Sequence, residues 1–157
     1  MRAAFPANSL AAIPDTTMPE ADLLQVCLDE LDGVDDLLAR RELAAERAPV
    51  LLGRPGIASR LATRIARTAD AEGNAPLDLF GVLVEQAQLD AENRGRFGAP
   101  FLAEARGAID TLAAGGDLPD EAALGLARAF VRAGLEAPEC LFPIFAGEPG
   151  TGQALAA

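Results

Sequence analysis

The chain lacks four residue types on which much enzyme chemistry depends. Its 157 residues include no histidine, lysine, tryptophan or tyrosine, so all 13 basic residues are arginines. Without histidine, the usual proton carrier at neutral pH, the commonest metal ligand and every histidine-based triad are missing. Without lysine, neither a Schiff base nor a Walker-type phosphate site can form. Carboxylates can still carry protons or bind hard cations, but no EF-hand spacing is present. We therefore expect a protein that is not an enzyme and holds no cofactor or metal.

Cysteine and long apolar runs are also scarce. The two cysteines, Cys27 and Cys140, form no CxxC pair, and we interpret each as a small buried apolar residue in a reducing compartment. The longest apolar stretches are a few residues, too short to span a bilayer, and no charged segment leads into a long apolar one at the N-terminus. We therefore expect a cytoplasmic protein with no membrane partner.

The charge of the chain is strongly negative. Twenty-four acidic residues against 13 arginines give a formal net charge of −11. Phosphate binding needs a basic face, and the seven phenylalanines lie in mostly apolar settings rather than among basic residues that would accompany stacked bases. The composition therefore predicts no nucleic-acid partner. If the protein has a partner, the acidic balance favours a basic one.

Length and hydrophobic patterning predict the fold class. A chain of 157 residues, half of them apolar, suits one domain with a real core. Apolar residues recur at helical spacing, and no run alternates as a strand would. We predict an all-α protein, a compact bundle of five or six helices, with stacked helical hairpins as one arrangement. The bundle spans residues 16–146, between a flexible arm at 1–15 and a frayed tail at 147–157.

Helix-breaking residues divide the first half of the chain into three segments. The sequence Thr17-Met18-Pro19-Glu20 has the form of a capping box, so it predicts a helix that follows it. Asp32 is the expected cap of the second segment, which should end near Pro49. The turn Gly53-Arg54-Pro55-Gly56 then precedes a third segment, which ends at Glu72-Gly73-Asn74.

Three further helices are predicted in the second half. The fourth begins with Pro76 and is the most hydrophobic, so we expect it at the centre of the bundle. The fifth runs from Pro100 to Gly115, and the sixth from Pro119 to Gly134. The residues expected to face the core are Leu24, Cys27, Leu28, Leu31, Val34, Leu37, Leu38, Leu43, Ile57, Leu61, Ile65, Leu79, Phe80, Leu83, Val84, Ala87, Phe101, Leu102, Ala105, Ile109, Leu112, Leu124, Ala127, Phe130 and Val131.

Two windows of the chain resemble each other at an offset of 43 residues. Residues 68–76 and 111–119 both read as a helix end, a glycine turn and a proline-started helix. The offset lies within the range of HEAT-like helical pairs. Helix-end and turn chemistry alone accounts for most of the agreement, and two units are fewer than a solenoid usually needs.

An arginine stripe is the first candidate site. Arg60, Arg64 and Arg67 are spaced to share one side of a helix, in a stretch that also holds Arg54 and contains no acidic residue. Arginine forks bind carboxylates and phosphates, so the stripe is a candidate docking face. The alternative is that these arginines pair with acidic residues of the first helices, such as Asp29, Asp35 and Asp36, or face solvent.

The second candidate is the segment Thr68-Ala69-Asp70-Ala71-Glu72-Gly73. It resembles the [S/T]-x-x-x-E-[G/N] inhibitory motif of the antitoxins and inhibitory helices of Fic-domain adenylyltransferases. The resemblance covers six residues. It implies that Glu72 would pair with an arginine of a partner enzyme and obstruct the γ-phosphate of its nucleotide, with Thr68 in support. The alternative is an ordinary helix end and turn.

Two other features could serve a partner. The acidic residues Asp29, Glu30, Asp32, Asp35 and Asp36 could attract a divalent cation or a basic surface, or form a solvated helix face and cap. The segment from Leu141 to Phe145 is apolar but interrupted by proline. Its Phe142 and Phe145 could contact another subunit, or the segment could pack on its own core.

Together these observations favour a non-catalytic helical protein that binds another protein, as an adaptor, regulator or neutralising partner, or that self-associates. The candidate partner-binding residues are Arg60, Arg64, Arg67, Glu72, Phe142 and Phe145. One alternative is a bundle that binds a small apolar ligand along the helix from Pro76 to Leu89. Another is an antitoxin-like inhibitor of a Fic-type enzyme.

Overall fold

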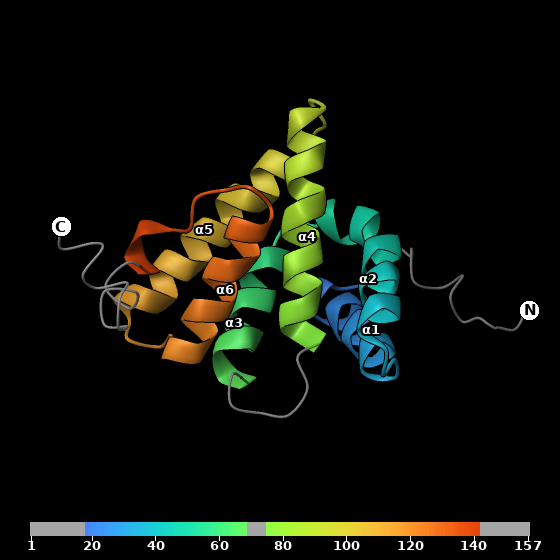
Figure 1. Ribbon diagram of the computed structural model, residues 1–157, viewed down its shortest axis with the longest axis horizontal. Coiled ribbons are helices and arrows are strands. Elements are labelled where there is room, and N and C mark those ends of the chain that lie inside the picture. Colours follow the sequence, from blue (N-terminus) through green and yellow to red (C-terminus); the bar gives the residue numbers. More distant parts are fainter. Residues whose placement is uncertain (1–17, 69–74, 142–157) are drawn as a thin grey trace, which may run out of the picture.

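A computed structural model describes residues 18–68 and 75–141 of the chain (Figure 1). The all-α prediction is confirmed, since these residues form six α-helices and a 3-10 turn and contain no strand. The predicted arm at 1–15 and tail at 147–157 lie outside the described residues. The elements are α1 (Glu20–Asp32), α2 (Leu37–Leu52), α3 (Ile57–Thr68), α4 (Ala75–Glu92), α5 (Gly98–Ala114), α6 (Asp120–Arg132) and η2 (Glu139–Leu141).

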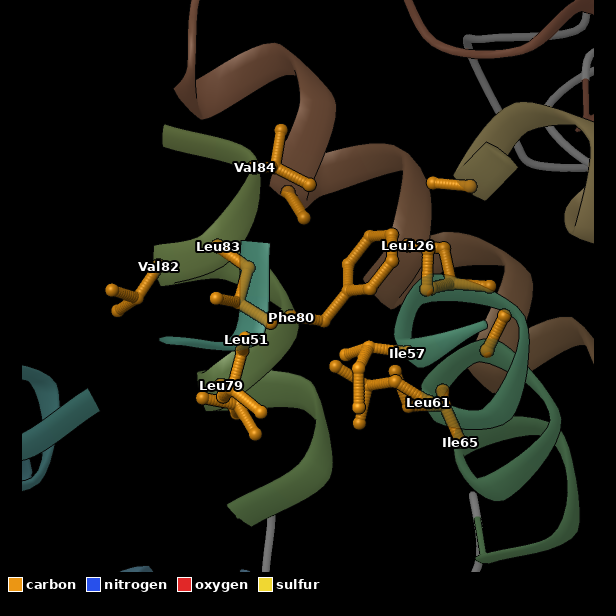
Figure 2. Close-up of a cluster of buried hydrophobic side chains, with 14 of the residues drawn as sticks. Leu51, Ile57, Leu61, Ile65, Leu79, Phe80, Val82, Leu83, Val84 and Leu126 are labelled. Carbon is orange, nitrogen blue, oxygen red and sulfur yellow. The ribbon is translucent and has the colours of Figure 1, made fainter. Parts of the chain in front are cut away.

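The central position predicted for the fourth helix is confirmed. In Figure 1, α4 lies between α2 and α6, and it packs against each of the other five helices. Its residues Leu79, Phe80, Leu83, Val84 and Ala87 are all buried, as expected. Phe80 meets Phe130 of α6 edge to face, with ring centroids 6.0 Å apart. Figure 2 shows side chains of α4 meeting those of α3, α6 and the end of α2 in one continuous core.

The helices pack mainly with their next-but-one neighbours in the chain. The α2–α4, α3–α5 and α4–α6 pairs are among the most extensive contacts, as in stacked helical hairpins. The α4–α5 contact is equally large, so the hairpins do not stack as separate units. Of the two similar windows, most of the first lies outside the described residues. The Thr68 hydroxyl, at the last residue of α3, donates to the Arg64 carbonyl, and the Thr111 hydroxyl, in the last turn of α5, donates to the Gly107 carbonyl.

Several helix ends differ from those predicted. The helix predicted after Thr17 is confirmed, but it begins at Glu20 with Pro19 at its N-cap position, and Thr17 lies outside the described residues. Asp36, rather than Asp32, caps α2 by accepting from the Ala39 amide at 2.8 Å. Helix α2 continues through Pro49 to Leu52, because Leu51 is fully buried and its burial favours one more turn.

At the other end of the bundle, α5 begins at Gly98, before Pro100, because one Asp90 carboxylate oxygen accepts from the amides of Phe97 and Gly98. The glycine stops predicted after α5 and α6 are confirmed. Gly116 and Gly134 have φ of 72° and 81°, the left-handed region in which a glycine ends a helix.

Two of the predicted apolar faces are partly wrong. Leu37 and Leu38 are exposed, because α2 contacts α4 through Ala44, Ala48 and Leu51 further along. Val131 is exposed as well, since the buried face of α6 is centred on Leu126 and Phe130. Leu124 is only half-buried for the same reason. Among the described helices, none combines the length and apolar character that crossing a membrane requires.

Candidate functional site: an arginine groove between α1 and α3

Helix α3 is the most sharply two-sided helix of the bundle. Its apolar residues fall on one side and are all buried, which turns the arginine stripe to the other side. The buried residues are Ile57, Ala58, Leu61, Ala62, Ile65 and Ala66. The predicted stripe is therefore confirmed as a continuous face of one helix. Of its members, Arg60 and Arg67 are exposed and Arg64 is half-buried.

A carboxylate from α5 fixes the start of α3. One oxygen of Glu104 accepts from the Gly56 amide at 3.0 Å, and the other accepts from the amide and hydroxyl of Ser59 at 2.9 and 3.0 Å. These bonds satisfy donors that a helix N-terminus leaves free, and the negative charge complements the helix dipole. Glu104 thereby holds the first turn of α3 in place next to Arg60.

The arginine stripe borders a groove of about 360 Å³ between α1 and α3. Helix α1 supplies one wall and α3 the other. The lining residues are Ala21, Leu24, Ser59, Arg60, Thr63, Arg64 and Arg67. We call this feature the arginine groove. Its lining contains three positive charges and no negative one.

The arginines of the groove have no acidic partner in the part of the chain that the structure describes. No ion pair there involves Arg60, Arg64 or Arg67. Arg64 donates to the side-chain oxygen of Gln25, whose amide donates in turn to Asp29 at 2.8 Å. A neutral amide therefore separates Arg64 from the nearest acid of α1. Direct pairing with Asp29, Asp35 or Asp36, the alternative considered from sequence, is not seen among the described residues.

Other arginines of the chain are paired. Arg40 lies 2.9 Å from Asp78, Arg41 2.7 Å from Glu85 and Arg47 3.0 Å from Glu30, measured between nitrogen and oxygen. Arg54 does not line the groove. It donates to the Met18 carbonyl and lies 3.6 Å from Glu20, so it fixes the start of α1.

The acidic residues at the end of α1 and the start of α2 have structural partners. Glu30 accepts two hydrogen bonds from Arg47, and Asp36 caps α2. Within residues 18–68 and 75–141, no three histidine, cysteine or acidic side chains gather as a metal site would require. The cap interpretation therefore holds for Asp36, and Glu30 belongs to an ion pair.

The two cysteines are free thiols with raised pKa values. Burial, assisted by the negative charge of Glu30, raises the pKa of Cys27 to about 11. Burial and a hydrogen bond with Asp110 raise the pKa of Cys140 to about 11. Because the thiolate is the nucleophile, both are poor nucleophiles at neutral pH. Cys27 is buried as predicted, whereas Cys140 is only half-buried.

The other candidate residues are only partly placed. Glu72, Phe142 and Phe145 lie outside the described residues. Thr68 is the last residue of α3. Leu141, the only described residue of the C-terminal apolar segment, is buried in the turn η2, which contacts α5 and α6.

Two features of the groove were not predicted from the sequence. Glu104 is 45 positions from Ser59 and has no local signal of a capping role. The α1 wall, formed by Ala21 and Leu24, depends on how α1 packs against α3. The stripe itself was predictable because it depends only on helical periodicity.

Comparison with known proteins identifies a family but no activity. The family model described as "Uncharacterised protein y4lR N-terminal domain" matches residues 21–138. No curated protein and no solved structure matches the chain. The matched range includes all six α-helices except the first residue of α1. The chain belongs to the y4lR N-terminal domain family.

Proposed function

We propose that this member of the y4lR N-terminal domain family is a non-catalytic module that binds an acidic segment of another protein in the arginine groove. One observation carries the proposal. Three arginines line the groove without an acidic partner among the described residues, although the chain has a net charge of −11. The missing histidine and lysine support a binding role rather than catalysis. The free, high-pKa thiols fit the cytoplasm as the proposed location.

The spacing of the arginines indicates which kind of partner segment would fit the groove. Arg60 and Arg67, the first and last arginines of the stripe, are seven positions apart in the helix, which corresponds to a span of about 10 Å. An acidic segment with two or three carboxylates over that length could pair with all of them. The methyl and methylene groups of Ala21, Leu24 and Thr63 offer an apolar contact for the partner's backbone and short side chains.

A protein segment fits the groove better than a nucleic acid does. Three arginines make few phosphate contacts, and the net negative charge of the chain repels a long polyanion. The groove lining includes no aromatic side chain on which a base could stack. A short acidic segment meets only the local positive field.

A labelled acidic peptide tests this function. The probe is a fluorescein-labelled peptide of alanine with three glutamates, titrated with the full chain at low salt and followed by fluorescence anisotropy. We expect Arg60→Gln/Arg67→Gln to weaken binding about tenfold, as the loss of charge-assisted bonds implies. The matched control is Arg94→Gln/Arg96→Gln, which removes the same charge from the connector between α4 and α5.

Three outcomes would count against the proposal. If the groove and control variants weakened binding equally, binding would depend on the net charge of the chain and not on the groove. Tighter binding of a single-stranded DNA of equal charge would favour nucleic acid. A homo-oligomer that dissociates in the groove variant would identify a second copy of the chain as the occupant, which analytical ultracentrifugation would detect.

A second candidate function rests on a groove of about 450 Å³ between α2 and α4. Its lining includes Leu52, Leu89 and Phe97, of which Leu89 and Phe97 are exposed. This surface supports the small apolar-ligand alternative. That alternative was predicted along the helix from Pro76 to Leu89, and the groove lies at the Leu89 end. A gain in melting temperature with a fatty acid, lost in Leu89→Ser, would favour this function.

The antitoxin-like alternative depends on Glu72 and stays a proposal. Its test is neutralisation of a Fic-type enzyme by the full chain and by Glu72→Ala. Neutralisation that survives the substitution would exclude this mode of action.

A further inference from the structure

A second arginine-lined cleft lies on α2, α4 and α6. It has a volume of about 340 Å³, and its lining comes from α2, α4 and α6, with α4 between the other two (Figure 1). The residues are Leu37, Arg40, Arg41, Leu77, Asp78, Gly81, Glu85, Gly125, Arg128, Ala129 and Arg132. Four arginines and two carboxylates line it, so positive charges outnumber negative ones by two. We call this feature the α4 cleft.

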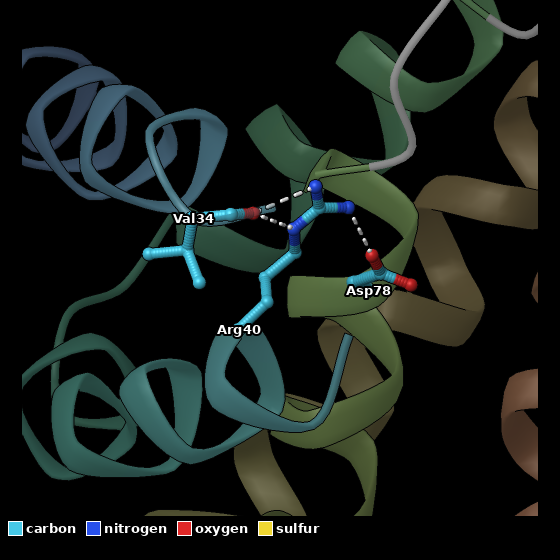
Figure 3. Close-up of polar contacts among 3 residues, drawn as sticks. All are labelled: Val34, Arg40 and Asp78. Carbon is cyan, nitrogen blue, oxygen red and sulfur yellow. Dashed lines mark hydrogen bonds and ion pairs between the residues drawn. The ribbon is translucent and has the colours of Figure 1, made fainter. Parts of the chain in front are cut away.

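Both acidic residues of the cleft are already neutralised from α2. Figure 3 shows the Arg40 guanidinium between two partners, donating to Asp78 at 2.9 Å and twice to the Val34 carbonyl at 3.0 and 3.2 Å. Arg41 donates to Glu85 at 2.7 Å. Asp78 and Glu85 therefore do not leave a strong negative field to repel an anion.

The two arginines of α6 remain for a ligand. Arg128 and Arg132 are one helical turn apart, both are exposed, and neither forms an ion pair with a described residue. Two guanidinium groups at this spacing can share one doubly charged group, because each presents several fixed N–H donors.

Glycine keeps the α4 side of the cleft open. Gly81 lies inside α4, where glycine costs about 1 kcal/mol relative to alanine. A Cβ atom there would meet nothing within 4 Å, so packing does not require the glycine. A Cβ at Gly125, in contrast, would lie 2.6 Å from the Leu77 side chain, so that glycine serves close packing of α6 on α4. The space above Gly81 is therefore available to a ligand.

We propose that the α4 cleft binds a small molecule with a compact doubly negative group, a phosphate or a dicarboxylate, through Arg128 and Arg132. Arg41, on the other side of the cleft, stays paired with Glu85 and so keeps that carboxylate from repelling the ligand. Leu37 and Leu77 offer an apolar surface for the rest of the molecule. This site is separate from the arginine groove and does not depend on its function.

NMR of arginine Nε–Hε signals tests the proposal, because the chain has no tryptophan or tyrosine to report binding by intrinsic fluorescence. The full chain is titrated at constant ionic strength with inorganic phosphate in one arm and succinate in the other. We expect saturable shifts of the Arg128 and Arg132 signals, assigned by Arg128→Gln and Arg132→Gln. The double variant should weaken binding about tenfold or more.

A pair of glycine variants controls for folding. Gly81→Leu extends a side chain over the cleft and should abolish the shifts in a folded protein. Gly107→Leu makes the same change in α5, where a Cβ also meets nothing within 4 Å, and should leave binding unchanged. A response to phosphate alone or to succinate alone supports the site and identifies its ligand group. Non-saturable shifts, equal shifts at Arg94 and Arg96, or binding that survives Gly81→Leu would each overturn the proposal.

Discussion

Helices α2 and α3 carry three arginines each and use them in opposite ways. Helix α2 buries only Ala44, Ala48 and Leu51, and none of the seven residues before Ala44. Its arginines, Arg40, Arg41 and Arg47, each reach an acidic residue on α4 or α1. Helix α3 buries six apolar residues, and no ion pair among the described residues involves Arg60, Arg64 or Arg67.

The difference suggests how each helix is held in the bundle. Helix α2 has little apolar surface to bury, so polar contacts supplement its packing, and Arg40 also fixes the turn before it through the Val34 carbonyl (Figure 3). Helix α3 is held by its apolar face, since that burial is the larger energy. We therefore expect its arginines to contribute little to stability, which leaves them available to a partner.

The largest expected effect is on the apolar face of α3. Leu61 is fully buried, so Leu61→Ala should lower the free energy of unfolding by about 3 kcal/mol. Leu38 of α2 is 68% exposed, so Leu38→Ala should change it by less than about 0.5 kcal/mol. Urea unfolding followed by circular dichroism at 222 nm measures both. Similar losses would mean that the two helices are held in the same way.

The next effect is a pH dependence of the free energy of unfolding, which comes from Cys27 near the Arg47–Glu30 pair. Cys27 is buried with its pKa raised from 9.0 to about 11, so the folded state holds the thiol proton more tightly than the unfolded state does. This stabilisation is complete below pH 9 and is lost as the pH rises through about 11, a difference of about 2 kcal/mol. Urea unfolding at pH 8 and pH 11 should therefore show a smaller decline for Cys27→Ala than for the wild type. An equal decline would contradict the burial of the thiol.

Arg47 and Arg67 should differ in how much each contributes to stability. Arg47 is 13% exposed and donates two bonds to Glu30, so Arg47→Gln should cost about 1–2 kcal/mol of stability. Arg67 is exposed and has no ion pair among the described residues, so Arg67→Gln should cost less than about 0.5 kcal/mol. Thermal unfolding of the two variants measures the difference. If Arg67→Gln is the more costly, the stripe has a structural role.

The smallest effect concerns the helix caps. Asp36 caps α2 from the same segment, whereas Glu104 caps α3 from α5. Each substitution by alanine should cost about 1 kcal/mol. Only Glu104→Ala should also weaken binding of the acidic peptide, because it loosens the turn that carries Arg60. If Asp36→Ala also weakened peptide binding, the effect of Glu104→Ala would come from lower stability alone.

Local patterns predicted most of the fold. Apolar spacing placed α3 and α4 correctly, because a buried helix face depends only on residues three and four apart. Glycine stops after α5 and α6 were also predictable. The exposure of Leu37, Leu38 and Val131 was not, since it depends on which neighbour each helix meets.

The candidate site was predicted less completely. The sequence placed Arg60, Arg64 and Arg67 on one face, but it could not tell pairing from exposure. Two of the three acids considered as partners have other roles in the structure: Asp36 caps a helix and Asp29 accepts from Gln25. The α4 cleft joins residues of three helices, of which the first, Leu37, and the last, Arg132, are 95 positions apart, and no local pattern predicts this.

Two triple variants measure the central difference most directly. One replaces Arg40, Arg41 and Arg47 with glutamine, the other Arg60, Arg64 and Arg67, and the free energy of unfolding of each is compared with the wild type. The account predicts a loss of about 3 kcal/mol or more for the α2 variant, because three half-buried partners lose their counter-charges. It predicts a loss within about 0.5 kcal/mol for the α3 variant. Equal losses would contradict it, because the arginines of the groove would then be holding the fold together.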